Sequence, residues 1–258
     1  MKVIQVEGNI AAGKSTFIHF IQNMLSTNVE KNETHTSICR KISNEDIEIK
    51  ELSNNIKKLK IKIIEEPISE WQENSNIFQK YYSDPSQYAE TFQTFVFGTL
   101  LLEALLSQID RDTDVVVMER SLYSCVYCFG KLLLTDHLIS ETYHETMRHI
   151  YDRYRGITIH PDILVYFQTK NEDVHLLKKR ILERDRKEEK NISTQYLLKL
   201  NNIYEDIIEN GKEFQSVKKI YIPSHLVKET QQEKYFVPIL RDVITELLSQ
   251  RRDKKESK

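Results

Sequence analysis

The sequence predicts an α/β protein in which a parallel sheet of five strands lies between two layers of helices. Apolar, β-rich runs recur along the chain, each is followed by a longer segment with helical periodicity, and a glycine-rich phosphate-binding motif directly follows the first run. Alternation of strands and helices is typical of a parallel sheet covered on both faces. The expected strands are Val3–Val6, Ile61–Ile64, Val115–Met118, Ile163–Phe167 and Ile220–Ile222.

The segments between these runs should form the covering helices. Apolar residues recur at helical spacing in Thr16–Leu25, Tyr88–Ile109 and Thr194–Ile208. Four of the five strand runs are almost continuously apolar, as expected for strands that are buried on both faces. Ligands of parallel α/β sheets bind beyond the carboxyl ends of the strands, so the residues that follow each run are the candidates for chemistry.

The chain is expected to form a single domain, residues 1–258, since 258 residues with 40% hydrophobic content can bury one sizeable core. The segment at about 26–60 is rich in Asn, Lys, Glu, Thr and Ser, which predicts a polar insertion on the surface. The charged tail at about 251–258 should lie outside the packed fold.

Charge and composition argue against several classes of partner. The chain has 37 basic and 39 acidic residues, so its net charge of −2 does not favour bulk binding to nucleic acid or to an anionic membrane. No uninterrupted apolar run approaches the ~20 residues that span a bilayer. From the three cysteines and a first strand that starts at Val3, we expect a cytoplasmic protein without a leader, acting in the host cytoplasm if it is viral.

The first strand runs into a complete phosphate-loop motif, G-x-x-x-x-G-K-[ST]. Its glycines let successive backbone N–H groups point at phosphates, and the following helix contributes the positive end of its dipole. The lysine should reach the β- and γ-phosphates, and the serine should ligate Mg²⁺. The motif indicates a P-loop NTPase-like fold that binds a nucleoside triphosphate through Gly8, Asn9, Ile10, Ala11, Ala12, Gly13, Lys14, Ser15 and Thr16.

Carboxylates follow the second and third strands. Glu65 and Glu66 come directly after the second strand, and Glu119 and Arg120 end the third. A carboxylate near a phosphate loop can hold Mg²⁺ or accept the proton of an attacking hydroxyl, and an arginine can stabilise the charge on a phosphoryl group in transfer. The alternative is that these charges only mark the ends of strands, and the neighbouring phosphate loop makes the functional interpretation the stronger one.

Three arginines lie in the segment KKRILERDRKEEKN. Arg180 and Arg184 are four residues apart and share one helix face, and Arg186 stands near the expected helix end. Such a segment can close over a triphosphate as an arginine-rich lid and exclude water. A salt-bridged helix on the surface would also explain this pattern.

Taken in order, these pieces resemble the deoxynucleoside kinase family, which includes the insect multisubstrate kinase, mitochondrial thymidine kinase, and the deoxycytidine and deoxyguanosine kinases. The resemblance runs from residue 2 to about 225 and is interrupted by the polar insertion. Each motif alone is weak or moderate, whereas their joint presence in this order is specific. The motifs are EGNIAAGKST, EEPxxxW, YxDPxxYAxxFQ, MERSxYS and RxxxRDRxEE.

The resemblance implies roles for the residues that match these motifs. Glu66 would be the base that takes the proton of a nucleoside 5′-hydroxyl, and Arg120 would contact that hydroxyl and the phosphoryl group. Glu119 would assist Ser15 in binding Mg²⁺. The matched substrate-binding residues are Tyr82 and Glu189 for the sugar 3′-hydroxyl, Gln93 for the edge of the base, Trp71, Phe92 and Phe129 as aromatic walls, and Ile10 as an apolar contact; Arg180, Arg184 and Arg186 match the lid.

Two further positions bear on the substrate class that the resemblance implies. Family members that prefer deoxycytidine and deoxyguanosine carry an arginine and an aspartate where this sequence has Leu100 and Cys125. An uncharged wall leaves room for the 5-methyl group of thymine. We therefore expect an enzyme that uses Mg²⁺ and ATP to phosphorylate thymidine and deoxycytidine for salvage synthesis of DNA precursors.

Two alternatives and an oligomeric state complete the prediction. A thymidylate kinase would phosphorylate a monophosphate instead, and would favour Asp-Arg where this chain has Glu119 and Arg120. A non-catalytic, kinase-like nucleotide-binding subunit should have lost the loop lysine, the glutamate base or the lid arginines, all of which are present. The helical stretch Phe95–Leu106 is more apolar than one core face needs, so we expect it to form the interface of a homodimer.

Overall fold

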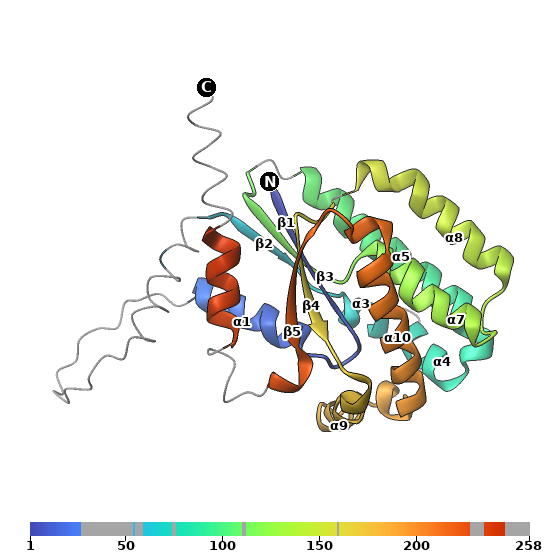
Figure 1. Cartoon of the computed structure of the whole chain (residues 1–258). Coiled ribbons are helices and arrows are strands. Elements are labelled where there is room, and N and C mark those ends of the chain that lie inside the picture. The colour runs from blue at the N-terminus through green and yellow to red at the C-terminus, as the bar shows by residue number, and fades with distance from the viewer. Residues whose placement is uncertain are drawn as a thin grey trace.

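The computed structural model describes residues 1–26, 54, 59–73, 76–109, 112–158, 160–227 and 235–245. Most of the predicted insertion at about 26–60 and the whole predicted tail at 251–258 lie outside the described residues. The described part is built around one sheet, which Figure 1 shows at the centre of the molecule.

The sheet confirms the predicted five parallel strands. Its strand order is β2-β3-β1-β4-β5, and every neighbouring pair is parallel. The register sets Val6 of β1 beside Glu119 of β3, so the carboxylate at the end of β3 lies next to the start of the phosphate loop. The strands are β1 (Lys2–Gly8), β2 (Ile61–Ile64), β3 (Val115–Glu119), β4 (Ile163–Gln168) and β5 (Lys218–Pro223).

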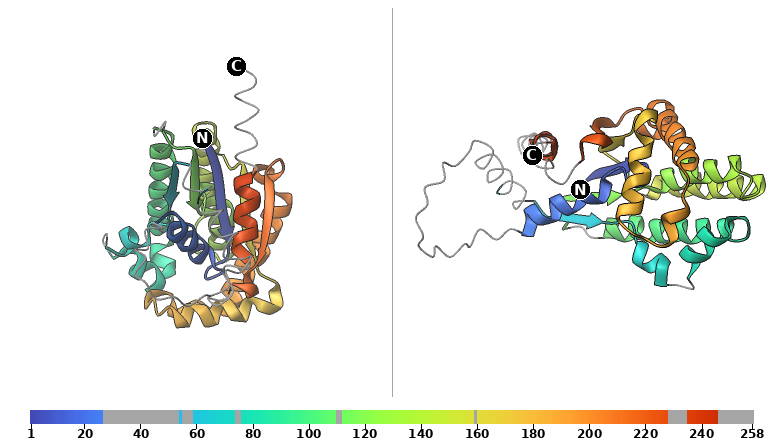
Figure 2. Two further views of the ribbon diagram at one scale, coloured as in Figure 1. Left: turned by 90° about the vertical axis from the view of Figure 1, so that its left-hand side faces the viewer. Right: turned by 90° about the horizontal axis from the view of Figure 1, so that it is seen from below.

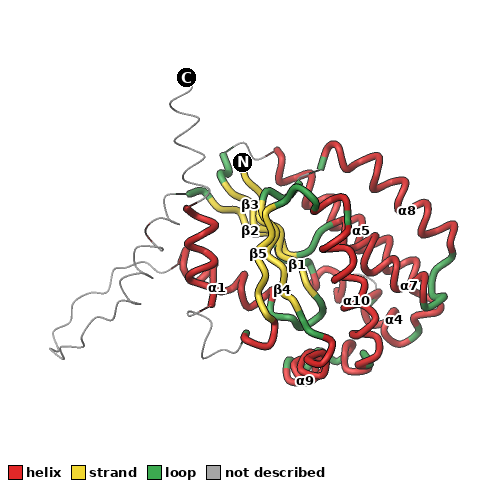
Figure 3. The backbone as a smooth tube through the Cα atoms, viewed as in Figure 1, coloured by secondary structure: helices red, strands yellow, loops and turns green. Residues whose placement is uncertain are grey.

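Helices cover both faces of the sheet and give the predicted three-layer architecture (Figures 1 and 3). One layer contains α1 (Lys14–Ser26) and the helix over residues 235–245, and the other contains α5, α7, α8 and α10. The helix α9 lies across the carboxyl ends of the strands, as the left view of Figure 2 shows. The remaining helices are α3 (Ile68–Glu73), α4 (Ile77–Ser83), α5 (Pro85–Ile109), α6 (Leu122–Ser124), α7 (Lys131–Thr135), α8 (Glu141–Tyr154), α9 (Val174–Glu183) and α10 (Thr194–Asn210).

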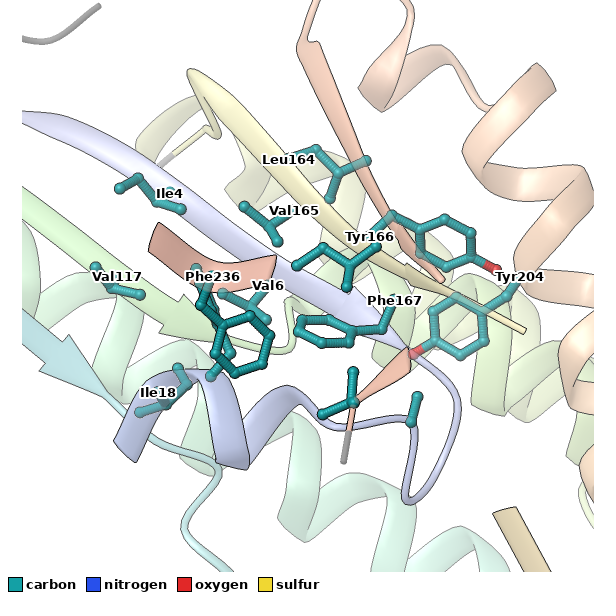
Figure 4. Packing of buried hydrophobic residues seen from close by; sticks show 14 of the residues in the cluster. Ile4, Val6, Ile18, Val117, Leu164, Val165, Tyr166, Phe167, Tyr204 and Phe236 are labelled. Carbon is teal, nitrogen blue, oxygen red and sulfur yellow. The ribbon is translucent and has the colours of Figure 1, made fainter. Parts of the chain in front are cut away.

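Buried side chains around the sheet form two hydrophobic clusters, and the first of them includes successive residues of β4, which point to opposite faces. The first cluster joins the strands to α1, α10 and the C-terminal helix, and Figure 4 shows Phe236, Phe167 and Val6 packed within it. The second cluster joins β3 to α5 and includes Val116, which is fully buried. Alternate residues of β3 therefore face opposite clusters, which explains why the strand run is apolar throughout.

The helix α5 is long and apolar on average, although polar residues such as Glu103 interrupt its apolar runs. Among the described residues it is the one helix that is long and apolar enough, by length and composition, to cross a bilayer. Phe92 and Phe97 of this helix are buried in the second cluster, while Leu102 is 56% exposed. Long core helices pass the same test of length and composition, and the predicted run Phe95–Leu106 lies within this helix.

Candidate active site

A cleft of about 980 Å³ opens at the carboxyl ends of the strands. The phosphate loop, the ends of β2 and β3, the helices α4 and α5, and the segment after α9 all contribute to its walls. This is the position where parallel sheets bind ligands. Its lining includes twenty of the predicted site residues: Ile10, Ala11, Ala12, Gly13, Lys14, Ser15, Thr16, Glu66, Trp71, Tyr82, Phe92, Gln93, Glu119, Arg120, Cys125, Phe129, Arg180, Arg184, Arg186 and Glu189.

The phosphate loop has the backbone geometry that its glycines permit. Gly8 and Gly13 have φ angles of 145° and 115°, and a side chain on Gly13 would approach Val227 to 2.8 Å. Ala11 adopts a left-handed conformation with φ of 59°. Asn9 lies beneath the loop, where its amide donates to the carbonyl of Leu197 on α10 at 2.8 Å. The hydrogen bond of Asn9 thus attaches the loop to α10, while residues 10–16 line the cleft.

Lys14 is buried at the base of the cleft. Its ammonium group donates to the backbone carbonyls of Gly8 and Asn9, at 3.3 and 3.0 Å. Burial, together with the nearby charge of Arg120, lowers the pKa of Lys14 to about 8, although the carboxylates around it oppose the shift. The lysine is therefore still mostly charged at pH 7 and can attract an anionic ligand.

This pKa predicts a pH dependence of ATP use. The value of kcat/KM for ATP should fall as the pH rises through about 8, because Lys14 of the free enzyme loses its proton there. Steady-state kinetics between about pH 6.5 and 9 would measure it. In Lys14→Arg the guanidinium stays protonated, so the fall should disappear. An identical fall in the arginine variant would show that another group is responsible.

Ser15 and Glu119 meet at the end of β3. The Ser15 hydroxyl donates to a Glu119 carboxylate oxygen at 2.9 Å, and both residues line the cleft. Their oxygens are the kind of ligand that Mg²⁺ prefers, and Mg²⁺ in kinases is held by one or two such groups together with substrate phosphates and water. The donor set at this point therefore fits a magnesium ion bound with a nucleotide.

Glu66 and Arg120 both line the cleft and form an ion pair. The Arg120 Nε donates to Glu66 Oε1 at 2.7 Å, and the side chain of Arg120 is 4% exposed. The guanidinium also lies over the ring of Phe129, at 4.5 Å from its centroid. Arg120 has a φ of 67°, an uncommon conformation for a residue other than glycine. A carboxylate and a guanidinium are thus fixed side by side where they can face a hydroxyl and a phosphoryl group.

Aromatic side chains of α3, α4 and α5 line part of the cleft. Trp71 contacts Phe92 edge to face, with ring centroids 5.9 Å apart, and Tyr81 stacks on Phe92 at 4.7 Å. The Trp71 indole N–H donates to Thr99 at 3.0 Å, which fixes the orientation of that ring. A pocket with such walls suits a flat π-system.

Gln93 and Cys125 form a polar contact in the same pocket. The Gln93 amide nitrogen donates to the Cys125 carbonyl at 2.6 Å and approaches its sulfur at 3.2 Å. Cys125 begins a π-helical turn, Cys125–Gly130, which also presents Phe129 to the cleft. Wide turns of this kind occur often at functional sites. Cys125 and Cys128 are both buried, and burial raises the pKa of each thiol, so neither has the character of a reactive thiolate.

The lid arginines are engaged with neighbouring groups. Arg180 donates to the backbone carbonyls of Ala11 and Ser224, at 3.3 and 2.8 Å. Arg184 and Arg186 both form ion pairs with Glu189. The chain turns sharply between them at Asp185, which has a φ of 55°. These arginines therefore lie at the cleft, as predicted, but their N–H groups also bind carbonyl and carboxylate oxygens of the protein.

Comparison with known proteins identifies the family. A family model described as "Deoxynucleoside kinase" matches residues 49–245, which is more than half of the chain. The chain belongs to the deoxynucleoside kinase family. Members of this family act on a nucleoside and ATP. The match begins at residue 49, after the phosphate loop. The phosphate loop therefore indicates nucleotide binding independently of the family match.

Curated relatives include kinases of viruses and vertebrates. A probable deoxycytidine kinase of fowlpox virus is 26% identical over 254 residues, covering 95% of this chain and 89% of that protein. Human deoxycytidine kinase is 29% identical over 217 residues, covering 80% and 74%. A putative kinase protein of Invertebrate iridescent virus 3 is 33% identical over 141 residues, covering 55% and 67%.

Three predicted site residues of this deoxynucleoside kinase do not line the cleft. Gly8 and Asn9 belong to the phosphate loop but lie beneath its exposed side. Leu100 is 3% exposed and packs in the second hydrophobic cluster. It stands two helical turns beyond Gln93 on α5, about 10 Å further along the axis, which moves it past the end of the cleft.

Sequence reasoning also missed residues that do line the cleft. Tyr81 and Tyr196 contribute from α4 and α10, and their hydroxyls interact with each other. Neither residue lies in a motif position used above, although Tyr81 directly precedes Tyr82. Tyr82 itself is on α4, which contacts the turn that carries Glu189, so the two predicted sugar-binding residues come from segments that touch.

Proposed function

We propose that this protein transfers the γ-phosphoryl group of ATP to the 5′-hydroxyl of a pyrimidine deoxynucleoside, with thymidine and deoxycytidine as substrates. The observation that carries the proposal is the Glu66–Arg120 pair, which stands in one cleft with a phosphate loop and an aromatic pocket. The phosphate loop suits a triphosphate donor, and the aromatic pocket suits a nucleobase. The Glu66–Arg120 pair is suited to the 5′-hydroxyl of the nucleoside, which attacks the γ-phosphate of ATP.

The proposed reaction depends mainly on positioning and charge. Phosphoryl transfer has a loose transition state, so Glu66 would act by orienting the 5′-hydroxyl and by accepting its proton as the bond to phosphorus forms. Arg120 and Lys14 would stabilise the charge on the equatorial phosphoryl oxygens. Ser15 and Glu119 would hold Mg²⁺, which neutralises phosphate charge when it is bound with ATP.

The proposed pyrimidine preference rests on Gln93 and Cys125. The amide nitrogen of Gln93 donates to the Cys125 carbonyl. The oxygen of the same amide is an acceptor that suits the N3–H of thymine or the 4-amino group of cytosine. Cys125 is uncharged where relatives that prefer deoxycytidine and deoxyguanosine carry an aspartate. The relatives named deoxycytidine kinases support deoxycytidine as one of the two substrates.

An assay of ADP release with Mg-ATP tests this assignment. Each of the four deoxynucleosides is offered in turn, with thymidine monophosphate as a fifth acceptor. Thymidine and deoxycytidine should have kcat/KM values at least about tenfold above those of the purines, since a site built to pair one base edge rejects another strongly. Equal or better use of deoxyguanosine would contradict the pyrimidine assignment. Turnover of the monophosphate alone would make the protein a thymidylate kinase.

A further inference from the structure

We infer that Tyr204 and Glu7, which lie outside the cleft, are positioning residues for Arg120 in phosphoryl transfer. The inference rests on the proposed function, because it concerns the same reaction. Tyr204 is on α10 and Glu7 is on β1, and both side chains are fully buried. Neither residue is among those that line the cleft.

Hydrogen bonds connect the three side chains. The Arg120 Nη1 donates to the Tyr204 hydroxyl at 2.6 Å, and that hydroxyl donates to Glu7 Oε2 at 3.2 Å. The other oxygen of Glu7 accepts from the Ser121 hydroxyl at 2.6 Å. The network therefore begins at the ion pair with Glu66 and ends on the residue that follows Arg120 in the chain.

The chemistry of these groups fixes the direction of each hydrogen bond. Arginine has only donors, and an ionised carboxylate has only acceptors. A tyrosine hydroxyl has a single proton, so when it accepts from Arg120 it must give that proton to Glu7. Replacing the hydroxyl would separate Arg120 from Glu7 and leave one buried guanidinium N–H without its partner.

The position of Arg120 makes such support important. Its backbone φ of 67° is uncommon for a side-chain-bearing residue, and such conformations persist where the surroundings hold them. Glu66 and Tyr204 bind different nitrogens of the guanidinium, Nε and Nη1. Two anchors on a planar group fix its orientation as well as its location, which one anchor cannot do. Glu7 supplies a buried carboxylate that favours the charged guanidinium, and the charge of Arg120 in turn opposes the effect of burial on the pKa of Glu7.

The variant Tyr204→Phe tests the inference, with Tyr166→Phe as a matched control. Tyr166 is also buried, its ring lies 6.3 Å from that of Tyr204, and its hydroxyl also donates to a carboxylate, Glu205, at 2.9 Å. Figure 4 shows the two rings side by side, one from β4 and one from α10. The control therefore removes the hydroxyl of another buried tyrosine, whose hydrogen bond goes to Glu205 and not to Arg120.

Tyr204→Phe should lower kcat for thymidine about tenfold or more, while the KM values for thymidine and ATP change by less than about twofold. Tyr166→Phe should retain kcat, even where both variants lose similar thermal stability. A merely structural role would lower the melting temperature without separating kcat from KM. Glu7→Gln keeps the shape of the side chain and should lower kcat in the same direction. It also serves as the test variant if Tyr204→Phe does not fold.

The wild-type protein is measured first in the same assay. No turnover of any deoxynucleoside by the wild type would overturn both the proposed function and this inference. An active wild type whose kcat is retained in Tyr204→Phe and Glu7→Gln would overturn the inference alone. Equal loss of kcat in Tyr204→Phe and Tyr166→Phe would also overturn it, because the effect would then come from the core and not from Arg120.

Discussion

Replacing Glu66 by Gln is expected to lower kcat by about 10²–10⁴, with little change in KM for either substrate. Gln has nearly the same shape and can still accept the hydrogen bond that Arg120 Nε now gives to Glu66 at 2.7 Å. Arg120 should therefore keep its place. What the variant lacks is the charge that, in the proposed reaction, orients the 5′-hydroxyl and takes its proton, so the loss should fall on the step of phosphoryl transfer.

The neighbouring residue provides a control for Glu66→Gln. Glu65 also lines the cleft, but its side chain is 44% exposed and contacts Gln22 on α1 instead of Arg120. Glu65→Gln should retain most of the wild-type kcat. Steady-state kinetics with thymidine and thermal melting of both variants would test this. Equal losses in the two variants would mean that general charge at the cleft matters and that Glu66 has no special role.

Replacing Lys14 by Met should lower kcat/KM for ATP by about 10²–10³, because a buried cation that stabilises transferring phosphates has no substitute in an apolar side chain. Lys14 is 4% exposed and lies within the phosphate loop. In the proposed site the aromatic pocket and not Lys14 holds the nucleoside, so the affinity for the nucleoside, measured by calorimetry without ATP, should be retained. Loss of nucleoside binding as well would indicate that the loop had collapsed.

Lys179→Met is the matched control for the loss of a positive charge. Lys179 also lines the cleft, but its side chain is 72% exposed and contacts Glu183 at 3.7 Å on the same helix. An exposed charge of this kind is screened by water and salt. Lys179→Met should therefore change kcat/KM for ATP by less than about threefold. A loss as large as that of Lys14→Met would refute a specific role for the buried lysine.

The sheet and the phosphate loop could be predicted because their signals are local. Apolar runs place all five strands. The structure extends several of them by residues such as Lys2 and Glu7 of β1 and Glu119 of β3, whose backbones continue the ladder despite their polar side chains. The loop motif, the helix after it and the charges at the ends of β2 and β3 lie within a few residues of those runs. Parallel topology then brings the strand ends together without any further information.

The contacts that support the site could not be predicted in this way. Tyr204 and Glu7 are separated by 197 residues, and only the packing of α10 against the sheet brings them together. The pairing of Arg184 with Glu189 depends on a reversal of the chain at Asp185, for which helical periodicity gives no signal. Leu100 was expected in the wall of the cleft and does not line it, because two turns of helix separate it from Gln93.

Transfer of label from ATP that is radiolabelled at the γ-phosphate tests the central claim most directly. The protein is incubated with thymidine and Mg-ATP, and the products are separated beside a Glu66→Gln sample. The account predicts that label enters thymidine 5′-monophosphate in the wild type and that this product is nearly absent in the variant. Label that goes only to inorganic phosphate, or only to a diphosphate when thymidine monophosphate is supplied, would contradict it.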